Sequence, residues 1–180
     1  EARSATGEAL FVPGTSVGDS SAVMNSIYND CLLAGIEVKC SSVISQVDIS
    51  KKKVQLSDGT QLIYGHLINA SGLHADSVAH QFSVGKKYTL LPFKGIYWKL
   101  SPDSGIRVNH LIYPVPDLRV PFLGVHTTTS IDGNVYLGPT AVPAFGRENY
   151  RGLEGVTVSE LLRITNLLIK QTFSNRDGFR

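Results

Sequence analysis

The strongest constraint on the fold is a turn at Asp132-Gly133, which lies between two stretches typical of β-strands. Residues 120–129 are rich in β-branched and apolar side chains, and residues 134–137 have the same character. An Asp-Gly pair in this setting favours a two-residue hairpin turn, because both central positions of that turn prefer a positive φ. We therefore expect an antiparallel hairpin that ends at Gly138-Pro139, since proline cannot donate a hydrogen bond to a central strand.

This hairpin should bring polar side chains from neighbouring strands close together. His126 and Tyr136 lie on its two strands, and Tyr113 lies on the strand expected just before it, at 107–113. Pro114 follows and should end that strand. The sequence therefore predicts a small sheet with three side chains that can form hydrogen bonds or titrate.

Composition excludes several classes of protein. The chain has 180 residues, 42% hydrophobic and 18% charged, as in an ordinary globular protein. A net charge of +2 is too small to indicate nucleic-acid binding, and we assign the run 51–53 of three lysines to a solvated turn. The two cysteines and five histidines lack the spacing of metal ligands, so we expect no metal site. No apolar run approaches the ~18 residues of a membrane span.

Regular structure is also expected earlier in the chain. Asp19 or Ser20 can cap a helix that runs to about Gly35, and its apolar side chains recur at the spacing of a helix face that packs in the core. Residues 42–64 predict a small antiparallel meander around a second Asp-Gly turn, at 58–59. The start of the chain, Glu-Ala-Arg-Ser, has neither Met nor the apolar core of a signal peptide, so we expect a fragment.

A turn of small residues follows the meander. A short apolar strand at 65–68 enters Asn-Ala-Ser-Gly at 69–72, and a helix is expected over 74–82. Small residues at such a junction let the backbone approach a ligand closely, and a helix N-terminus favours anions. The alternative is an ordinary strand-to-helix turn. The sequence holds no Gly-x-Gly-x-x-Gly and thus no complete dinucleotide fingerprint.

Later segments predict further strands and a final helix. Lys94 is the only charged residue in the apolar segment 90–98, inside a strand expected over 88–100, so it either points to solvent or has a function. Thr157 and Glu160 form a capping-box pattern that begins a helix through about Phe173.

Three stretches resemble the L-2-hydroxyglutarate oxidase and dehydrogenase family, within the D-amino-acid-oxidase-like flavoproteins. They are residues 68–76, residues 92–97, and residues 112–150, which hold Tyr-Pro-Val-Pro-Asp at 113–117 and Gly-Pro-Thr-Ala at 138–141. The first stretch is shared widely among such flavoproteins, whereas the third is long and specific. The resemblance extends from about residue 8 to residue 150.

The resemblance implies an α/β (α+β) fold with FAD as cofactor. Residues 1–85 would be part of a Rossmann-like FAD-binding domain, residues 86–155 a mostly antiparallel substrate-binding sheet, and residues 156–180 a terminal helix. The family's glycine fingerprint would precede residue 1, and its closing FAD-binding segment would follow residue 180. We therefore expect a central fragment that does not carry the complete FAD site and is catalytically incomplete alone.

The resemblance also implies roles for individual residues. The turn 69–72 would pass close to the FAD diphosphate, and Val47 would make a backbone contact at the adenine end. His126 is the candidate base, with a satisfied core histidine as the alternative, and the tyrosines could equally be packing residues of the sheet. The expected sets are: catalytic, His126 and Lys94; cofactor-binding, Val47, Asn69, Ala70, Ser71, Gly72, Gly95 and Gly138; substrate-binding, Tyr97, Tyr113, Tyr136 and Arg147.

The implied reaction is oxidation of L-2-hydroxyglutarate, or a similar 2-hydroxy acid, to the 2-oxo acid by hydride transfer to flavin. The alternatives are an amine or D-amino acid oxidase of the same superfamily, and a truncated product without activity. The electron acceptor would be oxygen or a quinone. We expect a cytoplasmic location, including the surface of the inner membrane, or a mitochondrial one in a eukaryote.

Overall fold

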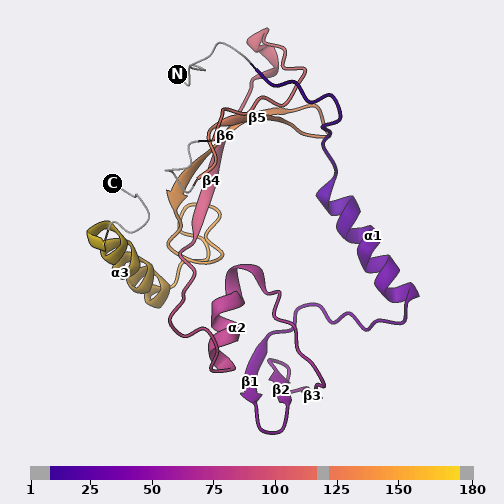
Figure 1. The fold of residues 1–180 in the computed structure, drawn as a ribbon, viewed down its shortest axis with the longest axis vertical. Coiled ribbons are helices and arrows are strands. Elements are labelled where there is room, and N and C mark those ends of the chain that lie inside the picture. The colour runs from indigo at the N-terminus through magenta and orange to yellow at the C-terminus, as the bar shows by residue number, and fades with distance from the viewer. Residues whose placement is uncertain (1–8, 117–121, 175–180) are drawn as a thin grey trace. The chain divides into compact units, whose positions relative to one another are not determined.

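The structure is a computed structural model that describes residues 9–116 and 122–174 (Figure 1). It separates into unit 1, which is Glu1–Met24 with Phe93–Arg180, and unit 2, which is Asn25–Pro92. Each unit contains an antiparallel sheet, so the expected mixture of helices and antiparallel strands is confirmed. The predicted division at residues 85 and 155 stays a prediction. Of the expected hairpin, Val120 and Pro121 lie outside the described residues.

Unit 2 is built on a three-stranded meander. Its strands β1 (Ile44–Asp48), β2 (Lys53–Leu56) and β3 (Gln61–Ile63) lie in that order. Val54 and Leu56 of the central strand are buried, at 5% and 7% exposure. The short helices η1 (Gly72–His74) and α2 (Ala75–Gln81) follow, and α2 contacts β1. The strand expected at 65–68 is wrong, since residues 64–71 form no strand.

The segment after α2 is fastened to that helix by two side chains. Asp76 accepts hydrogen bonds at Oδ2 from the backbone N–H of Leu90 (2.9 Å) and from Oγ1 of Thr89 (3.0 Å). His80, one turn later, lies 3.0 Å from the carbonyl oxygen of Tyr88 through Nε2. These contacts hold residues 85–90 as loop, so the strand expected over 88–100 begins only at Phe93.

Helix α1 (Ser20–Leu33) begins where its cap predicts. Asp19 Oδ1 accepts hydrogen bonds from the backbone N–H groups of Ser21 (2.9 Å) and Ala22 (3.1 Å). The expectation that its apolar face packs in a core is wrong for the described part of the chain. No residue of α1 is buried, and Met24 is 62% exposed.

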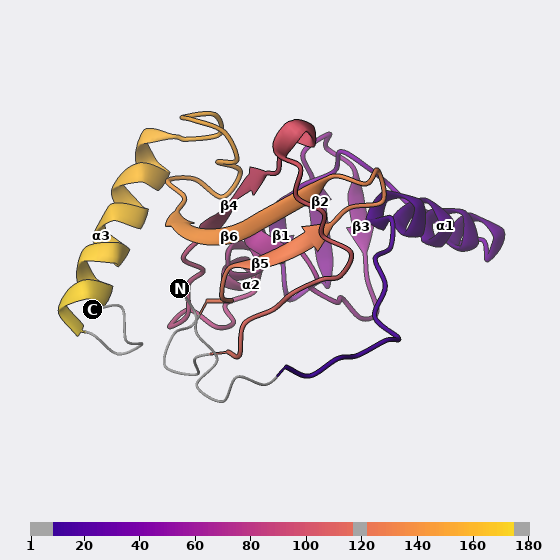
Figure 2. The same cartoon turned by 90° about the horizontal axis from the view of Figure 1, so that it is seen from above.

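Unit 1 holds a sheet in the order β4-β6-β5 (Figure 2). The strands are β4 (Phe93–Lys99), β5 (His126–Thr129) and β6 (Val135–Pro143). The prediction that the last strand ends at Gly138-Pro139 is wrong, because β6 pairs with β4 as far as Pro143. The register shifts between Ile96 and Trp98, so that β6 has one extra residue there. Such a bulge leaves one residue unpaired, which accommodates a proline in a central strand.

The hairpin between β5 and β6 is confirmed, but its turn differs from the two-residue turn expected. The backbone N–H of Ser130 bonds to the carbonyl of Asn134 (2.8 Å), and the N–H of Gly133 bonds to the carbonyl of Ser130 (2.9 Å). Gly133 has φ +78°, whereas Asp132 keeps a negative φ. This is a three-residue loop with its glycine in the left-handed region. The Asp-Gly turn at 58–59 has the same pattern.

The strand expected at 107–113 is also wrong, because residues 105–116 form no regular strand. Helix α3 (Val158–Ser174) begins as predicted, since Thr157 Oγ1 accepts a hydrogen bond from the backbone N–H of Glu160 (3.2 Å). Ile164 of α3 is fully buried. No helix within the described residues is both long and apolar enough to cross a membrane.

Candidate active site on the sheet of unit 1

One face of the β4-β6-β5 sheet gathers three of the predicted polar residues. His126 of β5 pairs with Gly138 of the central strand β6, and Tyr136 of β6 pairs with Lys99 of β4. Directly paired residues of an antiparallel sheet share a face, and residues two apart along a strand do as well. Tyr97 therefore joins this face, which we call the His126 face. The sheet thus brings His126, Tyr97 and Tyr136 onto one face, and the roles expected of them stay predictions.

His126 has a defined environment. Its side chain is 9% exposed, and its Nδ1 lies 2.9 Å from the carbonyl oxygen of Gly124. A carbonyl oxygen only accepts, so Nδ1 carries the proton and Nε2 is the free acceptor of the neutral ring. The Tyr113 ring stacks on the imidazole, with ring centroids 4.6 Å apart and planes at 25°. Among the described residues, no group hydrogen-bonds to Nε2.

Gly95 and Gly138 are both required by packing on this face. A Cβ at Gly138 would lie 2.7 Å from Cδ1 of Tyr97, and a Cβ at Gly95 would lie 2.7 Å from Cβ of Pro139. Real Cβ atoms do not approach so closely, so only glycine fits without a shift of the neighbouring strand. These two glycines let the strands close around Tyr97 and Pro139. Their predicted contact with a cofactor stays a prediction.

Lys94 is not on the His126 face. It precedes Gly95, whose Cβ direction points to Pro139 and Tyr97, so the Lys94 side chain leaves the opposite face of the sheet. There its Nζ donates a hydrogen bond to Oδ1 of Asn149 (3.0 Å). The two predicted catalytic residues, His126 and Lys94, are therefore separated by the sheet. A catalytic role for Lys94 stays a prediction.

Arg147 lies in the loop between β6 and α3. Its side chain is only 8% exposed, and its Nε lies 3.6 Å from Oε1 of Glu160 on the first turn of α3. The loop folds tightly there, because a Cβ at Gly146 would lie 2.4 Å from the carbonyl oxygen of Gly155. An arginine buried against a carboxylate holds the loop to the helix. Its predicted contact with substrate stays a prediction.

Two residues of this region were not predicted. Asn149 is 3% exposed and donates from Nδ2 to the carbonyl oxygens of Gly152 and Glu154, both at 2.9 Å. An asparagine in a glycine-rich loop is a signal for such side-chain bonds to the backbone. Lys99 lies on the His126 face opposite Tyr136. Its spacing of two from Tyr97, inside the strand expected over 88–100, was the signal that could have found it.

The turn 69–72 lies in unit 2 and is exposed. Asn69 braces it from within: Nδ2 donates to the carbonyl of Ala75 (2.8 Å), and Oδ1 accepts from the backbone N–H of Ser71 (3.3 Å). Gly72 has φ +53°, and a Cβ there would meet nothing within 4 Å. The turn is therefore a fixed backbone loop with open space beside Gly72, and its expected contact with the FAD diphosphate stays a prediction.

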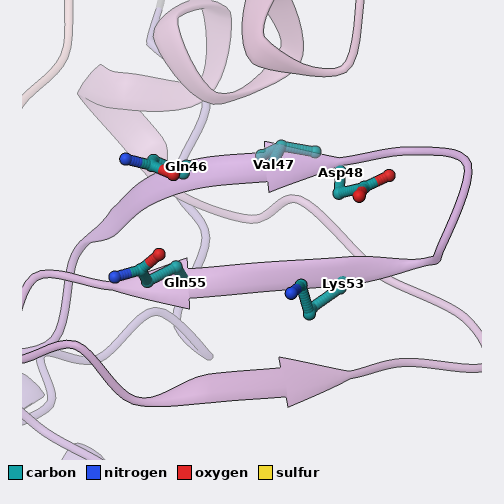
Figure 3. A pocket seen from close by; sticks show the side chains of 5 residues that line it. All are labelled: Gln46, Val47, Asp48, Lys53 and Gln55. Carbon is teal, nitrogen blue, oxygen red and sulfur yellow. The ribbon is translucent and has the colours of Figure 1, made fainter.

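Val47 lies in β1 opposite Val54 of β2. The neighbouring side chains line a shallow depression on this hairpin (Figure 3); they are Gln46, Val47, Asp48, Lys53 and Gln55. Hydrogen bonds from Ser50 Oγ (2.7 Å) and from the backbone N–H of Lys51 (3.0 Å) lower the pKa of the Asp48 carboxyl. The Asp48 carboxylate therefore accepts its hydrogen bonds from the turn that follows β1. Among the described residues, no group of three or more His, Cys, Asp or Glu side chains is arranged to hold a metal ion.

Comparisons with known proteins give the family. Residues 1–175 match the model of the FAD dependent oxidoreductase family, DAO. L-2-hydroxyglutarate dehydrogenase of Escherichia coli (strain K12) is 38% identical over 147 residues, which cover 79% of this chain and 34% of that protein. The mitochondrial L-2-hydroxyglutarate dehydrogenase of Mus musculus is 33% identical over 156 residues, with the same coverage of 79% and 34%.

The mitochondrial L-2-hydroxyglutarate dehydrogenase of Bos taurus matches over 182 residues at 30% identity, covering 93% of this chain and 39% of that protein. The chain thus spans between a third and two fifths of the length of these relatives. The match to the family model extends over nearly the whole chain. The chain belongs to the DAO family of FAD dependent oxidoreductases.

Proposed function

We propose that this chain forms the central part of an enzyme that oxidises L-2-hydroxyglutarate, or a similar 2-hydroxy acid, to the 2-oxo acid. The observation that carries the proposal is the His126 face of the unit 1 sheet. It presents a buried imidazole with an acceptor nitrogen beside two tyrosine side chains, Tyr97 and Tyr136. The relatives named L-2-hydroxyglutarate dehydrogenase support the choice of substrate.

The cofactor would be FAD, which when bound supplies the acceptor for the hydride that leaves the substrate carbon. The turn Asn69, Ala70, Ser71 and Gly72 would lie against its diphosphate, because the turn is braced internally and is open on its outer side. Val47 would contribute a backbone contact at the adenine end.

The chain's own residues would orient the substrate and take its proton. His126 Nε2 would accept the hydroxyl proton, since the Gly124 carbonyl keeps the other ring proton on Nδ1. Tyr97, Tyr136 and Tyr113 would donate hydrogen bonds to the carboxylate or hydroxyl oxygens of the substrate. They would thereby fix the carbon that is oxidised next to the base.

A dicarboxylate substrate also requires a cation on the same face. Lys99 meets this requirement, since it lies opposite Tyr136 and two residues from Tyr97. Lys94 and Arg147 are held elsewhere, by Asn149 and Glu160 respectively. We assign the second carboxylate of the substrate to Lys99. The electron acceptor would be oxygen or a quinone, and the location would be cytoplasmic in a bacterium or mitochondrial in a eukaryote.

The test is flavin reduction by substrate. The chain is expressed alone and extended at both ends to the length of its relatives, and the visible absorbance is recorded after gel filtration. The extended protein is expected to be yellow and to bleach on anaerobic addition of L-2-hydroxyglutarate. If D-amino acids or glycine bleach the flavin and L-2-hydroxyglutarate does not, the proposal is refuted and the enzyme is an amine oxidase. A protein that never retains flavin would refute the enzymatic proposal.

Two variants of the extended protein test the residues. His126→Gln is expected to lower kcat by about 10²–10⁴-fold, the usual contribution of a general base. Lys99→Met is expected to raise KM for L-2-hydroxyglutarate by about tenfold, as loss of one charged contact would. The same variant should have little effect on a 2-hydroxy acid with a single carboxylate. Lys87→Met, an exposed lysine of unit 2, is the matched control.

A further inference from the structure

The segment before β5 is attached to it through one threonine. The backbone N–H of Thr127 donates to the carbonyl of Ile112 (3.0 Å), and the N–H of Ile112 donates to Thr127 Oγ1 (2.8 Å). The same hydroxyl donates to the carbonyl of His110 (3.3 Å). Residues 105–116 form no strand, so no ladder of backbone hydrogen bonds joins them to β5. The three bonds of Thr127 hold the segment there instead, and they set where Tyr113 lies.

A second contact fixes the carbonyl that binds His126. A Cβ at Gly124 would lie 2.5 Å from Cγ of Pro114, so the backbone at Gly124 packs directly on the proline ring. A proline ring has little freedom to move aside. The Gly124 carbonyl is therefore held in place, and it accepts the hydrogen bond from His126 Nδ1 at 2.9 Å.

The third contact is the stack of Tyr113 on the imidazole. The ring centroids are 4.6 Å apart, and the tyrosine itself is 57% exposed. Tyr113 thus covers one face of a histidine that is nearly buried, and it turns its own outer side to solvent. A half-turn of the His126 ring about χ2 would break the bond to Gly124, and the partly turned ring that this flip passes through would also lose the stack on Tyr113.

We infer that Tyr113, Gly124 and Thr127 are positioning residues that hold His126 in one orientation and one tautomer. The proton is on Nδ1, which leaves Nε2 as the proton acceptor. This inference rests on the proposed function for the reaction that the histidine serves. The geometry it describes belongs to the chain itself and is measurable without flavin or substrate.

The first measurement is the tautomer of His126 by NMR. Histidine labelled with ¹⁵N is incorporated into the full chain, and long-range ¹H–¹⁵N correlations are recorded over a pH series that extends until the His126 signals no longer change. The His126→Gln variant identifies the signal. The expected result is a single tautomer protonated on Nδ1. A His126 ring protonated on Nε2, or an even mixture, would overturn the inference.

Variants test which residues hold the tautomer. Tyr113→Leu removes the ring, and Thr127→Val keeps the branched shape of threonine without its hydroxyl. Both are expected to admit the Nε2-protonated form, whereas Tyr113→Phe keeps the stack and the single tautomer. Tyr88→Leu, at an exposed tyrosine of unit 2, is the control. Wild-type spectra for both Tyr113→Leu and Thr127→Val would refute the positioning role.

Turnover of the extended, flavin-loaded protein separates this inference from the proposed function. Thr127 follows His126 in β5 and points to the other face, so Thr127→Val removes no contact with substrate. It is expected to lower kcat by about tenfold with little change in KM, because misplaced catalytic groups lose rate rather than binding. Unchanged kcat in a variant that has lost the tautomer would refute His126 as the base and leave the positioning intact. Loss of activity in His126→Gln, with tautomer and kcat both unchanged in Thr127→Val, would refute the positioning alone.

Discussion

Replacement of Asn149 by alanine should destabilise unit 1 strongly, because its buried amide group forms four hydrogen bonds. Nδ2 donates to two backbone carbonyls, those of Gly152 and Glu154, and Oδ1 accepts from the N–H of Phe145 (3.4 Å) and from Nζ of Lys94 (3.0 Å). A bond to a neutral group contributes about 1 kcal/mol, and a bond to a charged group about 2 kcal/mol. The half-buried Lys94 can bond to water instead, and the bond from the N–H of Phe145 is long and therefore weak. We therefore expect the free energy of unfolding to fall by about 3 kcal/mol.

Urea unfolding followed by far-ultraviolet circular dichroism measures this loss. With a slope of about 1–3 kcal/mol per molar urea, the midpoint for Asn149→Ala should fall by roughly 1–3 M. Asn166→Ala, at an exposed asparagine of α3, should change the free energy of unfolding by no more than about 0.5 kcal/mol. Lys94→Met should cost about 1–2 kcal/mol, since it removes one of the four bonds. A cost below about 1 kcal/mol for Asn149→Ala would refute the argument that this amide holds the loop.

Three further substitutions follow from the structure. Gly138→Ala places a methyl group 2.7 Å from Cδ1 of Tyr97 and should cost about 1–3 kcal/mol in urea unfolding; a neutral result would contradict the close packing. Lys39 donates to the Asp58 carboxylate at 2.7 Å and holds its pKa well below the ordinary 3.8, so the folded state gains stability above that pH and loses it as the pH falls through the lowered pKa. The melting temperatures of wild type and Lys39→Met should therefore differ most at about pH 6, and the difference should shrink progressively as the pH falls below 3.8; a constant difference would contradict the linkage. Thr157→Ala removes the cap of α3 and should cost about 1 kcal/mol in urea unfolding, which Thr157→Ser should restore.

Local chemistry made the helix starts and hairpins predictable from the sequence. Asp19 and Thr157 cap helices because their side-chain oxygens reach backbone N–H groups within three residues, and nothing distant is needed. The Asp-Gly pair at 132–133 marks a turn for the same reason. The length of that turn was not predictable from the pair alone, because glycine takes the positive φ by itself and aspartate accepts a bond from the N–H of Asn134 (3.2 Å).

The ends of the strands depended on distant partners and were missed. Pro139 lacks an N–H group, which indicated that the strand would end there. It does not end because β4 continues to pair beyond the proline, across a bulge that no local pattern reveals. Conversely, the segment that carries Tyr113 was predicted as a strand, but it docks on β5 through the side chain and N–H of Thr127.

The choice between cations for a dicarboxylate shows why such distant pairing decides a site. Lys94 and Lys99 lie five residues apart in one strand, so simple alternation places them on opposite faces. Which of them shares the face of His126 depends on the register across β6, where the bulge at Gly138-Pro139 shifts the pairing by one residue. If the register of Phe93–Ile96 continued without the bulge, Gly138 would pair with Trp98, and the alternation from His126 across β6 would select Lys94. The backbone direction at Gly95 and the pairing of Lys99 with Tyr136 reverse that choice, and they assign Lys94 to the loop that Asn149 holds.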